Sequence, residues 1–165
     1  MRWCSMTKAQ KNLLWLLAGA GVIALGAGAG LAEAAPGDGA PGDGTPAGHD
    51  PRVKRIAAAI AIAERGAAEI ASGAIKRNNP GDLTDGAGNL AVYPTLGAGW
   101  QALYDQIARI LNGSSPYYPG GPAMSITDVG YVYADGVDDP SGASNWAANV
   151  SSVLGVDPST PIGQV

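Results

Sequence analysis

The sequence has one cysteine, Cys4, and one histidine, His49. Cys4 precedes a long apolar segment, so the chain has neither a disulfide framework nor a thiolate metal site. His49 lies in a Pro/Gly-rich segment, which excludes a Ser-His-Asp triad, a Cys-His pair and a His-based zinc site within the folded part. No nucleotide-binding loop is present. No cofactor or metal is therefore implied.

Basic residues are few once the first 34 residues are set aside. The remaining chain has seven Lys and Arg against thirteen Asp and Glu, a net charge of −6. Such a surface repels phosphate backbones, which excludes nucleic acid as a partner. The 25 glycines and 12 prolines predict many turns, and the length leaves room for one domain.

The N-terminus combines a basic start with an apolar run. Residues 1–12 carry three basic and no acidic side chains, and residues 13–32 carry no charge and lead into an Ala-Glu-Ala tripeptide. This layout predicts that residues 1–34 are either a signal peptide, cleaved after Ala34, or an N-terminal hydrophobic helix that anchors the chain in a membrane through residues 13–32. In both cases the rest of the chain is exported beyond the cytoplasmic membrane.

The remaining chain divides into a linker and a domain. Residues 35–49 repeat Ala-Pro-Gly-Asp-Gly and form a flexible linker, and residues 50–165 form the domain. Apolar spacing and caps predict helices over 51–65, 97–112 and 126–134, a fourth helix ending at Gly155, and a draped or frayed tail over 158–165. Turn residues between Gly73 and Gly99 predict a small β-hairpin. The expected fold class is mainly α with that hairpin.

Carboxylate chemistry remains after these exclusions, and the domain has two glutamates. Glu64 ends the first predicted helix on its alanine and isoleucine stripe, while Glu69 falls on another face. Burial against an apolar stripe raises the pKa of a carboxyl group and suits it to act as a general acid. The alternative for Glu64 is an ordinary acid in a last helical turn.

The segment Arg77-Asn78-Asn79-Pro80-Gly81-Asp82-Leu83 follows in the predicted hairpin region. Pro-Gly is suited to a bend, and paired asparagines can bond to local backbone or to a ligand. From the residues alone, the segment is a turn that leads into a strand.

Several stretches together resemble a phage-associated, lysozyme-like family of peptidoglycan-cleaving virion proteins. They are residues 56–64, the Asn-Asn-Pro-Gly-Asp-Leu element at 78–83, Tyr93 to Leu103, Trp146 to Val150 and Leu154 to Val156. The resemblance covers about residues 56–161. It implies a lysozyme-like fold in which a glutamate at the end of the first long helix, here Glu64, faces a hairpin across a sugar-binding cleft.

The resemblance also implies a reaction. A lytic transglycosylase cleaves the MurNAc-GlcNAc β-1,4 bond with one acid/base, Glu64 here, and the 6-hydroxyl of the sugar as nucleophile. A hydrolytic lysozyme needs a second carboxylate, for which Asp82 and Asp85 are available, although both also suit turn positions.

The substrate-binding residues that we expect are Asn78 and Asn79, for N-acetyl groups, and Tyr93, Tyr131 and Tyr133, for sugar contact. Tyr131 and Tyr133 cannot face the same way on one helix, so at most one belongs in the cleft.

Other aromatic side chains have two interpretations. Tyr117 and Tyr118 form either a cleft wall or a cover for the core, and Trp100 and Trp146 are expected to pack in the core. The expected partners are peptidoglycan glycan strands and other virion proteins. The alternative function is a non-catalytic, glycan-binding or structural virion protein on the same scaffold.

Overall fold

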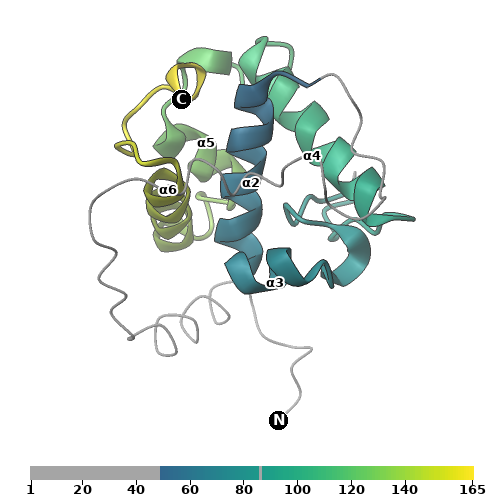
Figure 1. Ribbon diagram of the computed structural model, residues 1–165. Helices are drawn as coiled ribbons and strands as arrows, with labels where there is room; N and C mark the ends of the chain where they lie inside the picture. The colour runs from purple at the N-terminus through teal and green to yellow at the C-terminus, as the bar shows by residue number, and fades with distance from the viewer. Residues whose placement is uncertain (1–48, 86) are drawn as a thin grey trace.

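The computed structural model describes residues 49–85 and 87–165, which form a mainly helical domain (Figure 1). Helix α2 (Pro51–Arg65) runs through its centre and packs against α4 (Leu96–Leu111) and α6 (Pro140–Leu154), while α5 (Ile126–Tyr133) packs against α6. The short elements are α3 (Ala67–Ser72) and the 3-10 turns η3 (Lys76–Asn78), η4 (Gly121–Ala123) and η5 (Ile162–Gln164).

Each long helix begins at a side chain that caps its first turn, and the sequence predicts two of these caps, Asp50 and Ser125. A cap oxygen accepts a hydrogen bond from a backbone N–H two or three residues ahead, which satisfies a group that has no partner within the helix. The caps are Asp50, Thr95, Ser125 and Asp139. The predicted bounds of α2, α4 and α5 and the predicted end of α6 agree with the structure to within one residue.

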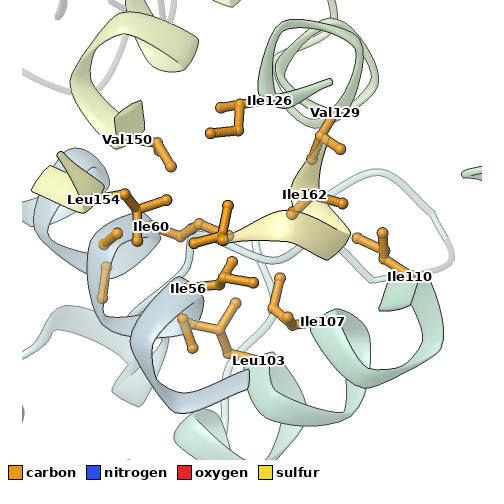
Figure 2. Close-up of a cluster of buried hydrophobic side chains, with 14 of the residues drawn as sticks. Ile56, Ile60, Leu103, Ile107, Ile110, Ile126, Val129, Val150, Leu154 and Ile162 are labelled. Carbon is orange, nitrogen blue, oxygen red and sulfur yellow. The ribbon is translucent and has the colours of Figure 1, made fainter. Parts of the chain in front are cut away.

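The core lies where α2 meets the other helices. Ile56 and Ile60 of α2 are fully buried at its centre. Figure 2 shows them between Leu103, Ile107 and Ile110 of α4 and a second group from the C-terminal half of the domain: Ile126, Val129, Val150, Leu154 and Ile162.

The predicted β-hairpin is not a strand pair. Thr84 and Leu90 form an isolated antiparallel bridge, and the described residues contain no strand. The N–H of Ala91 donates to the carbonyl of Leu83 (2.8 Å), and that of Asp85 to the carbonyl of Asn89 (2.7 Å). The two arms are too short for a regular ladder and have no third strand beside them, and such pairs are marginal. The fold class is therefore mainly α, and this segment is a structured loop.

Two further predictions concern the chain ends. The C-terminal tail is not frayed: Ile162 and Val165 are buried, and the N–H of Ile162 donates to the carbonyl of Met124 (2.8 Å). The apolar side chains of the tail fill the core, which short polar tails cannot do. The predicted hydrophobic helix over 13–32 lies outside the described residues, and no helix within them is long and apolar enough to cross a membrane.

Candidate functional site

Glu64 lies in the last turn of α2, half-buried against α6. Its Oε1 accepts a hydrogen bond from Nε1 of Trp146 (2.9 Å). The chain then turns away at Gly66, whose φ of 82° is in the region that favours glycine, and α3 begins at the next residue. Trp146 is buried, as predicted, but its indole N–H also fixes the orientation of the carboxylate.

Tyr133 joins this carboxylate to the loop that follows η3. Its ring stacks on that of Trp146, with 4.8 Å between centroids, and its hydroxyl donates to the carbonyl of Gly81. Burial raises the pKa of Tyr133 well above its ordinary value, and the charge of Glu64 adds to this effect. The hydroxyl therefore stays protonated and holds the loop against α5.

The loop is built around the side chain of Asn79, which is fully buried. Its Nδ2 donates to the carbonyls of Leu83 (2.8 Å) and Ala91 (3.1 Å), and its Oδ1 accepts from the N–H of Leu83 (2.9 Å). The prediction that Asn79 binds N-acetyl groups is wrong, because its side-chain amide is buried and bonds to the backbone of the loop. Asn79 instead holds the two arms of the loop together.

The first turn of α4 packs tightly on the same loop. A Cβ on Gly99 would lie 1.7 Å from the carbonyl oxygen of Asn78, so no other residue fits there. Nδ2 of Asn78 donates to the carbonyl of Tyr93 (2.9 Å) and closes the base of the loop. The Asn-Asn-Pro-Gly element therefore sets the position of the loop against α4.

Arg65 fixes the loop to α2. Its guanidinium donates to the carboxylate of Asp82 and to the carbonyl of Asn79 (3.0 Å), and both charged side chains are largely buried. A guanidinium can bond several acceptors at once because its donors form a rigid fork. Asp82 thus has a structural partner, in addition to its place in the cleft described next.

A cleft of about 590 Å³ opens between this loop, α4, α5 and the loop that follows α4. Its volume is in the range of about 300–1,000 Å³ that is typical of small-molecule sites. Polar and aromatic side chains dominate the lining, which comprises Asp82, Leu83, Thr84, Asp85, Tyr93, Ala102, Asp105, Gln106, Arg109, Tyr117, Tyr118, Val132 and Tyr133.

Four candidate site residues, Asp82, Asp85, Tyr93 and Tyr133, line this cleft, and so do Tyr117 and Tyr118, for which a cleft wall is one of the two interpretations. Asn78, Asn79, Tyr131 and Glu64 are not among the lining residues of the described chain. Tyr131 points elsewhere and is 49% exposed, so only one of the two α5 tyrosines faces the cleft. Glu64 reaches the cleft wall through Trp146 and Tyr133.

The sequence reasoning missed the floor of the cleft, which α4 provides. Ala102, Asp105, Gln106 and Arg109 follow each other at helical spacing on the face opposite to the buried stripe of Leu103 and Ile107. The helical spacing that predicts the apolar face of α4 also places these four residues together on one polar face. Such a face does not by itself indicate a cleft, because most polar helical faces are exposed to solvent.

No protein-family model, curated protein or solved structure matches the chain. Within the part of the chain that the structure describes, no group of three His, Cys, Asp or Glu side chains is placed to hold a metal ion. The function has to be inferred from the cleft and from the side chains around Glu64.

Proposed function

We propose that this protein cleaves peptidoglycan as a lytic transglycosylase on a lysozyme-like scaffold, with Glu64 as the acid/base for the MurNAc-GlcNAc β-1,4 bond. One observation carries the proposal: the half-buried carboxylate of Glu64 is oriented by Trp146, and Trp146 stacks on a tyrosine of the cleft wall. The resemblance of residues 56–161 to phage-associated, lysozyme-like proteins supports the same assignment.

The chemistry needs one carboxyl group. The acid form of Glu64 gives its proton to the glycosidic oxygen as the bond to C1 of MurNAc breaks. The carboxylate then takes the proton of the 6-hydroxyl of that sugar, whose oxygen bonds to C1 and forms a 1,6-anhydro ring. Glu64 recovers its proton, and no water is consumed.

The position of Glu64 restricts where the bond is cleaved. The scissile bond would lie at the Tyr133 end of the cleft, because Tyr133 lines the cleft and stacks on Trp146, which bonds to Glu64. Asp82 also lines the cleft, but Arg65 already engages its carboxylate. This pairing favours the transglycosylase over a hydrolase that uses Asp82 as its second carboxylate.

The substrate lies outside the cytoplasmic membrane, which fits export through residues 1–34 as a signal peptide or anchor. With an uncleaved anchor, the protein is suited to a virion membrane, where it would open the cell wall locally beside other virion proteins.

The test is digestion of purified peptidoglycan by the full chain in detergent, with mass spectrometry of the soluble muropeptides. We expect anhydro-muramic ends from the wild type and a loss of at least about 100-fold with Glu64→Gln. Glu69→Gln is the matched control, because Glu69 lies on α3 beside Arg65 (3.8 Å), whereas the indole N–H of Trp146 donates to Glu64. Full activity of Glu64→Gln would contradict the proposal, and reducing ends would identify a hydrolase.

A second candidate is a non-catalytic, glycan-binding virion protein on the same scaffold. It is favoured by the absence of Glu64 from the residues that line the cleft in the described part of the chain. A folded wild-type chain that binds glycan but releases no muropeptides would establish this candidate instead.

A further inference from the structure

The loop between α4 and η4 displays a large aromatic side chain at the edge of the cleft. Tyr117 lines the cleft and is 73% exposed, whereas its neighbour Tyr118 is 4% exposed and belongs to the core. One tyrosine thus anchors the loop and the other is presented to solvent. An exposed ring beside a cleft with polar groups has the amphipathic surface that ligands contact.

The loop holds Tyr117 in place before any ligand arrives. The N–H groups of Ser114 and Ser115 donate to the carbonyl of Arg109 (2.9 and 3.2 Å), and the N–H of Gly121 donates to the carbonyl of Tyr118 (2.9 Å). Prolines at 116 and 119 flank the two tyrosines and restrict the backbone further. A preorganised platform loses little conformational entropy on binding.

The remaining lining indicates the chemistry of the ligand. It has three carboxylates, from Asp82, Asp85 and Asp105, and one guanidinium, from Arg109, so a polyanion would be repelled. The hydroxyls of Tyr93 and Tyr117 can bond hydroxyl and amide groups. A β-1,4-linked N-acetylhexosamine carries such groups around its rim, and its ring faces are covered by C–H bonds that stack on an aromatic ring.

We propose that the cleft binds a β-1,4-linked N-acetylhexosamine strand along α4 and that Tyr117 is the stacking platform for the sugar farthest from Tyr133. The saccharide class rests on the proposed function, whereas the platform rests on the exposure of Tyr117 and the rigidity of its loop. Tyr117 is thus a determinant of how long a glycan the protein engages.

The test is the binding of tetra-N-acetylchitotetraose to the full chain, measured by isothermal titration calorimetry and by NMR chemical-shift changes. Tyr117→Ala should weaken binding by roughly three- to tenfold, the size of one aromatic contact. Tyr117→Phe should retain the affinity because it keeps the ring. Tyr131→Ala is the matched control, since Tyr131 is also exposed but does not line the cleft, and its affinity should change by less than about twofold.

The outcomes separate this inference from the proposed function. Wild-type affinity in Tyr117→Ala, an equal loss in Tyr131→Ala, or no binding by the wild type would overturn the platform. Unaltered peptidoglycan cleavage by Glu64→Gln together with weakened binding by Tyr117→Ala would leave the platform in place and overturn the catalytic assignment. Melting curves control for folding, because Tyr117 is exposed and its loss should leave the midpoint unchanged.

Discussion

The middle and the last turn of α2 have opposite surroundings. In its middle turns, Ile56 and Ile60 are fully buried among aliphatic side chains from three other helices. In its last turn, Glu64 and Arg65 are partly buried among polar partners from α6 and the loop after η3. The same helix therefore holds the fold together at its centre and carries charged groups to the cleft wall at its C-terminus.

The two regions show two different ways in which side chains stabilise a fold: apolar burial and specific polar contacts. Aliphatic side chains gain free energy from burial in any close-packed arrangement, whereas a buried charge is tolerated only where partners satisfy it in a specific geometry. The apolar middle of α2 consequently provides stability, and its polar last turn provides a defined position for the loop and for Glu64. Changes in the middle should unfold the protein, and changes in the last turn should misplace the site.

The largest effect should come from Ile60→Ala in the apolar middle of α2. We expect a loss of about 2–5 kcal/mol of unfolding free energy, because removing buried methylenes leaves a cavity among helices that cannot collapse fully. Urea unfolding measures this loss. The control is Val153→Ala on α6, whose side chain is 40% exposed and whose truncation should cost less than about 0.5 kcal/mol. Equal losses for the two variants would contradict the described core.

Arg65→Met tests the polar last turn. Removing the guanidinium takes away the partner of the largely buried Asp82 carboxylate, which should cost about 3 kcal/mol. The double variant Arg65→Met with Asp82→Leu should recover much of this loss, because no charge is then left behind. A double variant as unstable as the sum of the two single ones would mean that the ion pair is not coupled.

Tyr118 extends the comparison to a polar group inside the core. Burial raises its pKa from 10.0 to about 12, so its contribution to stability is complete below pH 10 and is lost as the pH rises toward 12. Two pKa units correspond to about 2.7 kcal/mol. Thermal unfolding between pH 9 and 12 should therefore depend less steeply on pH in Tyr118→Phe than in the wild type. Identical slopes would contradict the burial of this hydroxyl.

Much of the helical framework could be predicted from local sequence. Caps such as Asp50 and Ser125, and the apolar spacing of α2 and α4, act within one or two turns of a helix and are legible without tertiary contacts. The sequence does not predict α3, because Gly66 ends α2 and Ile70 is the single large apolar residue among the six of this helix.

The site could be predicted only in part, because its contacts join distant residues. Glu64 and Trp146 are 82 positions apart, and nothing in either local sequence pairs a glutamate with an indole N–H. The Asn-Asn-Pro-Gly element was identified, but its inner asparagine bonds to the loop rather than facing the cleft, since a buried amide must satisfy its own donors and acceptor first. The predicted β-hairpin between Gly73 and Gly99 likewise does not form, because no third strand in the described part of the chain lies beside its two short arms.

Trp146→Phe should cost less stability than Ile60→Ala or Arg65→Met, and it should also change the function. Phenylalanine keeps an aromatic ring against Tyr133 but removes the N–H that bonds to Glu64, which should cost about 1 kcal/mol of stability. Because Trp146 does not line the cleft, kcat for peptidoglycan cleavage should fall by roughly tenfold with little change in KM. Trp100→Phe is the control, as Trp100 is equally buried but stacks on Tyr104 of its own helix. A rise in KM at constant kcat in Trp146→Phe would instead mean that Trp146 contributes to substrate binding. Equal losses of kcat in Trp146→Phe and Trp100→Phe would mean that Trp146 contributes only to packing.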